Sequence, residues 1–235
     1  MIPPQFVKPY VKSNKNDARD AEAICEAMSR PNMRFVTVKT VAQQDIQATH
    51  RIREELKRRR TAKANQIRGL VAEYGLVAPK HLSSLRAAIP CWLEDAENGL
   101  THDFRSLLQG LWDDLLILDD RMDEMDKTIK RLAKDNEDCV RLQQLRDFGP
   151  MISTAMIATV GDARQYHNSR QMAAAIGLTP RQYSSGDQHR LLGISKRGDV
   201  YLRMLMIHGA RSVVTRAKHA RINHDGPASM NGCQL

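Results

Sequence analysis

The sequence contains few cysteines and no long apolar segment. Its four cysteines lie too far apart for the paired spacing of a zinc site, and they suggest no disulfide framework. No run approaches the roughly eighteen apolar residues of a membrane-spanning helix, and the start, MIPPQFVKPYVK, lacks the apolar stretch of a signal peptide. These absences exclude a disulfide-rich secreted domain and a helical membrane protein, and they predict a cytoplasmic protein. The cysteines, which we expect to be free thiols, are Cys25, Cys91, Cys139 and Cys233.

The charge is strongly of one sign. The chain has 36 Lys and Arg against 27 Asp and Glu, a formal net charge of +9. Such an excess favours a polyanionic partner, and without a spanning segment nucleic acid is favoured over a membrane surface. With 235 residues, 42% of them hydrophobic, the chain can form one large domain or two small ones with an ordinary core.

Acidic residues are missing from positions 1–16, so the first carboxylates of the chain are Asp17 and Asp20. They stand in a predicted helix that Ser13 or Asn14 can cap. Helical spacing puts both acids on the face of an apolar stripe, where buried carboxylates usually bind a divalent metal or meet cations. Alternatively, both are solvated first-turn acids that complement the helix dipole. The stripe consists of Ala21, Ile24, Cys25 and Met28.

The β-branched run from Phe35 to Val38 predicts a short strand. After it, the absence of proline predicts one long helix from Val41 to about Tyr74. Eight Lys or Arg stand between Arg51 and Arg68 against only two Glu. Such a run is typical of a solvated face, but it also suits a phosphate backbone. The candidate nucleic-acid-binding residues here are Arg51, Arg53, Lys57, Arg58, Arg59, Arg60 and Lys63; those expected to pack are Ile52, Leu56, Ile67 and Leu70.

A coiled-coil seam is predicted from Phe104 to Leu132, because its apolar residues follow alternating steps of four and three. The partner is either the basic helix, folded back as a hairpin, or the same helix of another protomer, and the sequence leaves both open. Before the seam, a short helix from Leu82 to Ile89 should end at Pro90. The seam residues are Phe104, Leu108, Leu111, Leu115, Leu118, Met122, Met125, Ile129 and Leu132.

Two serines, Ser184 and Ser185, stand at a predicted turn between an apolar helix and a basic one. Gly186 favours the turn, a return strand is expected from Leu191 to Ile194, and Asp199 is suited to cap the next helix. A serine beside a bound phosphodiester is a candidate nucleophile, although Ser-Ser-Gly is also ordinary turn chemistry. The cations that could hold the phosphate are Arg181, His189, Arg190, Lys196, Arg197 and Arg203.

Two further segments carry weaker signals. The stretch from Leu145 to Pro150 resembles the turn of a helix-hairpin-helix unit, which offers backbone N–H groups to phosphate. An ordinary helix–helix connection would look the same. Beyond His219 the periodicity is lost, which predicts a frayed end.

In this order, the features resemble the insertion-sequence-110 family of transposases (the 116/110/902 group), especially its 1111 branch. Members of this family are described as RNA-guided recombinases. The resemblance extends to about Lys218. It is carried by KNDARDA at 15–21, by RT at 60–61 with NQIRG at 65–69, and by AIGLTP at 175–180 with SG at 185–186 and KRG at 196–198.

This resemblance implies a mainly α-helical fold. We expect a remnant of a RuvC-like DEDD nuclease domain, an α/β fold, at 1–40 and a helical coiled-coil arm at 41–140. A C-terminal helical transposase domain with a small β-hairpin and the serine turn is expected at 141–219, and a frayed tail at 220–235. The implied function is DNA strand transfer, with Ser185 as nucleophile, Ser184 as the alternative, and Mg²⁺ on Asp17 and Asp20.

The partners implied are donor and target DNA, a guide RNA and further copies of the chain, with no membrane. The family's other two metal-binding acids lie on strands that would precede Met1, so the resemblance implies a truncated chain that is inactive alone. Whether His189, Asp187 or a metal-held water activates the serine stays open. Two alternatives also stay open: a helical nucleic-acid-binding module without chemistry, and a metal-dependent resolvase-like nuclease in which the serine is only a turn residue.

Overall fold

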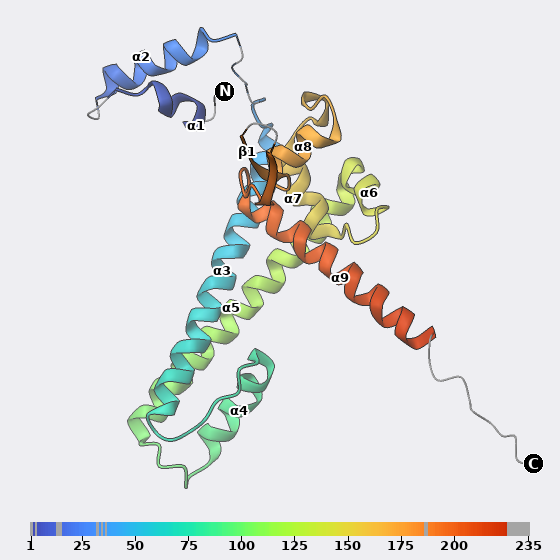
Figure 1. Ribbon diagram of the computed structural model, residues 1–235. Helices are drawn as coiled ribbons and strands as arrows, with labels where there is room; N and C mark the ends of the chain where they lie inside the picture. The colour runs from blue at the N-terminus through green and yellow to red at the C-terminus, as the bar shows by residue number, and fades with distance from the viewer. Residues whose placement is uncertain are drawn as a thin grey trace, which may run out of the picture. The chain divides into compact units, whose positions relative to one another are not determined.

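The computed structural model describes residues 2, 4–12, 16–31, 33, 35, 37–185 and 188–224 (Figure 1). Within them the fold is mainly helical, with one small antiparallel hairpin, as the sequence predicted. Two compact units are present: Met1–Gln44 with Ile157–Arg203, and Asp45–Met156 with Met204–Leu235. The elements are α1 (Pro4–Val7), η1 (Lys8–Tyr10), α2 (Asp17–Met28), α3 (Val41–Ala72), α4 (Leu82–Glu94), α5 (His102–Asp135), α6 (Glu137–Gln143), α7 (Pro150–Val160), η2 (Ala163–Gln165), α8 (Ser169–Ile176), β1 (Pro180–Ser185), β2 (Gln188–Ile194) and α9 (Val200–His224).

In the second unit, the helices α3 and α5 run side by side in opposite directions (Figure 1). Arg53 of α3 pairs with Asp126 of α5, Arg60 with Asp119 at 3.2 Å, and Lys63 with Asp114 at 2.9 Å. As the residue number rises along α3, the number of its partner falls along α5, which is the mark of an antiparallel pair. Of the two partners that the sequence left open for the α5 seam, this structure shows the basic helix of the same chain.

The predicted seam of α5 forms the buried face of this pair. Leu108, Leu115, Met122 and Ile129, spaced seven residues apart, are all buried. The alternate seam positions beyond Phe104 are half-buried: Leu111, Leu118, Met125 and Leu132. On α3, Leu56 and Ile67 pack as predicted, whereas Ile52 was wrongly placed in the core and is half exposed. Ile52 carries a branched apolar side chain, but it lies on the outer side of the helix.

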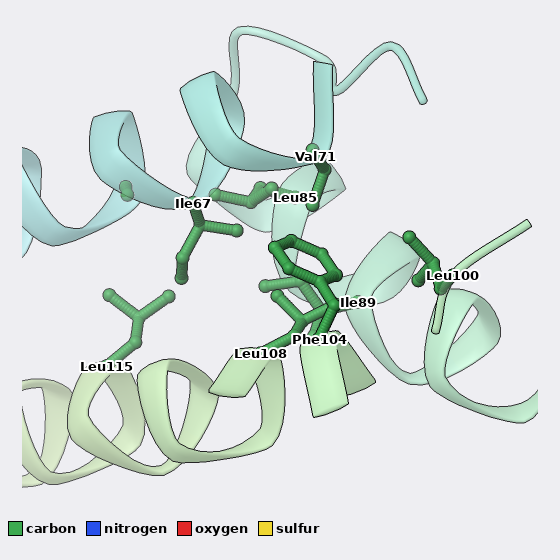
Figure 2. Close-up of a cluster of buried hydrophobic side chains, with 9 residues drawn as sticks. Ile67, Val71, Leu85, Ile89, Leu100, Phe104, Leu108 and Leu115 are labelled. Carbon is green, nitrogen blue, oxygen red and sulfur yellow. The ribbon is translucent and has the colours of Figure 1, made fainter. Parts of the chain in front are cut away.

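One end of the pair holds the main apolar cluster, to which α3, α4 and α5 contribute (Figure 2). Leu85 and Ile89 of α4 lie fully buried against Ile67, Val71 and Leu108. The prediction that Pro90 ends α4 is wrong, since the helix continues to Glu94.

The side chain of Arg105 explains why α4 continues past Pro90. Arg105 of α5 donates hydrogen bonds to the carbonyl oxygens of Trp92 and Leu93, at 2.9 Å each, and to that of Asp95. These carbonyls would otherwise lack partners at the helix end. A long-range arginine cap is invisible to local propensity rules, because it depends on how α5 packs.

The N-terminal helix α2 differs from its prediction in two ways. It begins at Asp17 and is capped by Asn16, whose side chain accepts from the N–H of Ala18 at 2.9 Å; Ser13 and Asn14 lie outside the described residues. The buried positions are Ala23 and Ala27, whereas the predicted core stripe is exposed, with Ile24 at 45% and Met28 at 57%. The strand predicted at 35–38 is also absent from its described residues, 35, 37 and 38.

Candidate functional site

The two serines lie at the end of a strand, not in the turn that the sequence predicted. Strand β1 ends at Ser185, which pairs with Gln188, and Ser184 pairs with His189. The return strand therefore starts at Gln188, three residues earlier than predicted, because the cross-strand ladder extends beyond the apolar run. Residues 186 and 187, which connect the strands, lie outside the described residues. Both strands are exposed along nearly their whole length.

The base of this hairpin is fixed to the C-terminus of α8. The N–H of Ser195 donates to the carbonyl of Thr179 at 2.8 Å, and the N–H of Lys196 donates to that of Gly177 at 3.1 Å. Two glycines with left-handed backbones allow the approach. A Cβ on Gly177 would lie 2.0 Å from the carbonyl oxygen of Arg197, and one on Gly198 would lie 1.8 Å from that of Ala175. This clamp, formed by Gly177 and the loop 196–198, presents the serines at the free end of the hairpin.

Arg203 belongs to the clamp and not to a phosphate-binding surface. It is buried, and its guanidinium donates to the carbonyl oxygens of Ile176 at 3.0 Å and Arg197 at 2.6 Å. Because these bonds occupy the guanidinium inside the fold, we assign Arg203 no contact with nucleic acid. Lys196 and Arg197 are exposed as expected. Asp199 caps α9 through the N–H of Leu202 at 2.7 Å, as the sequence predicted.

The structure divides the candidate cations of α3 into three groups. Arg53, Arg60 and Lys63 point to α5 and pair with its acids. Lys57 and Arg59 pair with Glu54 and Glu55 of the same helix, at 3.7 and 3.0 Å. The other two members of the set, Arg51 and Arg58, are exposed and form no ion pair among the described residues. The exposed cations of the set are therefore Arg51, Arg58 and Arg59, which remain the candidates for a phosphate-binding surface on this helix.

The candidate metal ligands Asp17 and Asp20 occupy the first turn of α2, where Asp17 is exposed and Asp20 half-buried. No group of three or more His, Cys, Asp or Glu within the described residues is placed to hold a metal ion. Mg²⁺ prefers six oxygen ligands and binds weakly to one or two carboxylates. The described residues therefore do not form a magnesium site by themselves.

The turn from Leu145 to Pro150 offers little support for a phosphate site. Asp147 has a left-handed backbone, and its largely buried carboxylate pairs with Arg216 of α9 at 2.8 Å. One oxygen of that carboxylate has no hydrogen-bond partner among the described residues. A buried negative charge beside the turn repels a phosphate. The ordinary connection between α6 and α7 is the interpretation that agrees with this geometry.

One buried titratable residue has no counterpart in the sequence predictions. His50 of α3 is 3% exposed, and its Nε2 lies 2.9 Å from the hydroxyl of Thr154 in α7. That hydroxyl donates to the carbonyl of Pro150 at 2.6 Å, so it accepts from the imidazole N–H. Burial, together with the charge of Arg53, lowers the pKa of His50 to about 4. A single histidine in a basic helix gives no local signal that its side chain is buried.

Two family models match separate parts of the chain. Residues 139–225 match the model described as "Transposase IS116/IS110/IS902 family", and residues 1–76 match a DEDD-type model described as a transposase. The first match contains the clamp and the serine hairpin. The second contains Asp17, Asp20 and the basic helix. None of the helices that the structure describes is both long and apolar enough to cross a membrane.

Similar proteins occur in several bacteria. The transposase for insertion sequence element IS1111A of Coxiella burnetii is 48% identical over 219 residues, which cover 93% of this chain and 60% of that protein. A probable family 20 transposase of Pseudomonas aeruginosa is 46% identical, with coverage of 91% and 64%. The transposase for insertion sequence element IS1328 of Yersinia enterocolitica is 39% identical, with coverage of 93% and 65%. The chain thus spans less than two thirds of the length of these relatives.

Proposed function

Because the chain belongs to the IS116/IS110/IS902 family of transposases, we propose that it acts in DNA strand transfer during the movement of an insertion sequence. The observation that carries this proposal is the serine hairpin: a fixed base, a free end, and Ser185 as the last residue of β1. A nucleophile must reach a backbone phosphate that is itself held in a bulky duplex. An exposed strand end provides that access.

The chemistry proposed for Ser185 is an exchange of phosphoester bonds. The serine oxygen forms a bond to phosphorus while one phosphorus–oxygen bond to deoxyribose breaks. The proton of the serine passes through solvent to the departing sugar oxygen, which becomes a hydroxyl. The number of phosphoester bonds is conserved, so the step needs no oxidant and can run in reverse when another sugar hydroxyl attacks. Ser184 is the alternative nucleophile.

Positive charge near the hairpin supports the binding of a backbone phosphate. Lys196 and Arg197 follow β2 on an exposed loop, where an ammonium and a guanidinium can meet phosphate oxygens. Arg51, Arg58 and Arg59 provide a separate sequence-independent contact on α3. The partners we propose are donor and target DNA together with a guide RNA, and we propose a homo-oligomer as the acting form.

Divalent metal would lower the cost of the charge that develops at the phosphate. Asp17 and Asp20 are our candidates for two of its ligands, and the remaining ligands would have to come from outside the described residues. We therefore propose that the chain alone binds DNA but forms no covalent adduct with it. The check is a denaturing gel after incubation with Mg²⁺, DNA and a candidate guide RNA. An adduct that disappears in Ser185→Ala would contradict this expectation about the metal site.

A second candidate function is a nucleic-acid-binding module without chemistry, which the incomplete set of metal ligands favours. Replacing the serine distinguishes strand transfer from binding without chemistry. In the Coxiella burnetii relative, replacing the residue aligned with Ser185 by alanine should lower movement of a marked element at least about a thousandfold, as expected for loss of a nucleophile. The matched control is alanine at the position aligned with Ser184. Movement that survives the first change but is lost in the second would move the nucleophile to Ser184, and movement that survives both changes would reject the serine mechanism.

A further inference from the structure

The two serines point to opposite faces of the hairpin. In an antiparallel ladder, directly paired side chains share a face, and successive residues alternate between faces. The register therefore places Tyr183, Ser185, Gln188 and Arg190 on one face, which we call the Ser185 face. Gln182, Ser184, His189 and Leu191 lie on the other. A hydrogen bond from the Gln182 amide to the Ser184 hydroxyl, at 3.0 Å, agrees with this assignment.

Each serine thus has a different titratable neighbour. His189 lies directly opposite Ser184, so it faces away from Ser185. Arg190 pairs with Tyr183 and is the diagonal neighbour of Ser185, about 7–8 Å away between backbones, which a long side chain can span. No other Arg, Lys or His among the described residues of the two strands shares this face so near to Ser185.

Arg190 is also available for a ligand. It is exposed, and it forms no ion pair with an acid among the described residues. Tyr183, which pairs with Arg190, is 73% exposed, so the side chains of this face do not pack into an apolar core. An exposed guanidinium that lies beside a hydroxyl can bind two oxygens of a phosphate diester. A lysine at this position would supply the positive charge but could not bind two phosphate oxygens in a bidentate manner.

We propose that the Ser185 face seats the DNA phosphodiester and that Arg190 binds its non-bridging oxygens, so that phosphorus is held in front of the Ser185 hydroxyl. His189 then has no part in activating Ser185, because it lies on the opposite face. This inference rests on the proposed strand-transfer function. It adds a substrate-binding residue and selects Ser185 over Ser184 by the neighbour that each serine has.

Thiol trapping tests this placement without requiring catalysis. Cys25, Cys91 and Cys233 are first replaced by serine in the full chain, while the buried Cys139 is kept. Ser185→Cys and Ser184→Cys are then compared. The probe is a DNA duplex that carries, on one central phosphate, a short tether ending in a mixed disulfide, and the measurement is the rate of protein–DNA disulfide formation.

We expect the Ser185→Cys protein to be trapped about tenfold faster than the Ser184→Cys protein. Adding Arg190→Ala should slow trapping of the former by about tenfold, equivalent to one charge-assisted contact, and of the latter by less than about twofold. Arg190→Lys should restore part of the rate. Arg181→Ala is the matched control, because Arg181 is an exposed arginine on the same strand, four residues or roughly 13 Å from Ser185.

Three outcomes would overturn the inference. They are faster trapping at position 184, equal slowing of both variants by Arg190→Ala, and an Arg181→Ala effect as large as that of Arg190→Ala. If trapping at position 185 is rapid but independent of Arg190, this inference is wrong while the proposed function still stands. If neither position is trapped above the serine-only background, the hairpin does not meet DNA, and both proposals are wrong.

Discussion

The α3–α5 pair and the serine hairpin both carry many cations, but they use them differently. On the helix pair, Arg53, Arg60 and Lys63 are matched by acids of α5, so charge there contributes to the fold. Along the hairpin, Arg181 and Arg190 have no acidic partner within the described residues. A count of basic residues therefore does not distinguish cations that pair within the fold from cations that are exposed.

The two regions also differ in what stabilises them. The helix pair has a continuous apolar seam and a cluster of buried side chains (Figure 2). The hairpin is a two-stranded ribbon without a buried face, and such ribbons are marginally stable alone. Its position depends on backbone contacts at its base.

The largest effect is expected at the clamp. Gly198→Ala should lower the free energy of unfolding by about 3–5 kcal/mol, because the backbone is left-handed and the new Cβ would overlap the carbonyl of Ala175. Gly193→Ala is the matched control, since a Cβ there meets nothing within 4 Å. Chemical denaturation measures both. Equal stability of the two variants would show that the clamp does not hold the hairpin.

Removal of a seam side chain should cost slightly less. Leu115→Ala deletes a fully buried side chain and should lower the free energy of unfolding by about 2–5 kcal/mol. Ile117→Ala, two residues away and 56% exposed, should change it by less than about 0.5 kcal/mol. Thermal unfolding of the pair of variants separates packing from helix propensity. A cost for Ile117→Ala as large as that for Leu115→Ala would mean that another surface covers α5.

Acid should weaken the second unit through His50. Its pKa is lowered in the folded state, so the unfolded chain binds the proton more readily. The stabilisation is complete above the unfolded pKa of about 6.5 and is lost as the pH falls toward 4, by up to roughly 3 kcal/mol. His50→Gln should flatten this part of the stability–pH curve. The control His102→Gln, at an exposed position, should leave the slope of the curve unchanged. An unchanged slope in the His50 variant would contradict the assignment.

The smallest effects concern binding. Replacing Arg58 and Arg59 by alanine should flatten the dependence of log K on log salt by about one to two units, because each arginine that meets a phosphate contributes about one unit to the slope. Arg60→Ala should leave this slope unchanged and instead lower stability, because Arg60 pairs with Asp119. Salt titrations with a DNA duplex test both. If Arg60→Ala flattens the slope as much as the double variant does, the division of the α3 cations is wrong.

Much of the helical framework was predictable because its signals are local. The absence of proline fixed the extent of α3 to within a few residues, the four-and-three spacing identified the buried face of α5, and Asp199 was recognised as a cap. One error arose where a distant contact overrode a local rule, because Arg105 supports α4 beyond Pro90. The cap of α2 differs for a local reason, since Asn16 directly precedes the helix and accepts from the N–H of Ala18.

The candidate site was predictable in its residues but not in its geometry. The serines, Asp17, Asp20 and the basic helix were all selected from the sequence, and their roles remain proposals. The interior position of Arg203 was not predictable, because the sequence does not show whether an arginine is exposed or donates to backbone carbonyls inside the fold. The metal ligands could not be completed from the described residues, since two acids in one helical turn do not define a cage.

The sequence by itself determined the family, the excess of positive charge and the periodic helices, because each is encoded in residue type and spacing along the chain. Only the tertiary structure decided which cations are paired across α3 and α5, that His50 is buried against Thr154, and which face of the hairpin each serine occupies. These features depend on residues far apart in the chain and on strand register. A shift of that register by one residue would exchange the neighbours of the two serines.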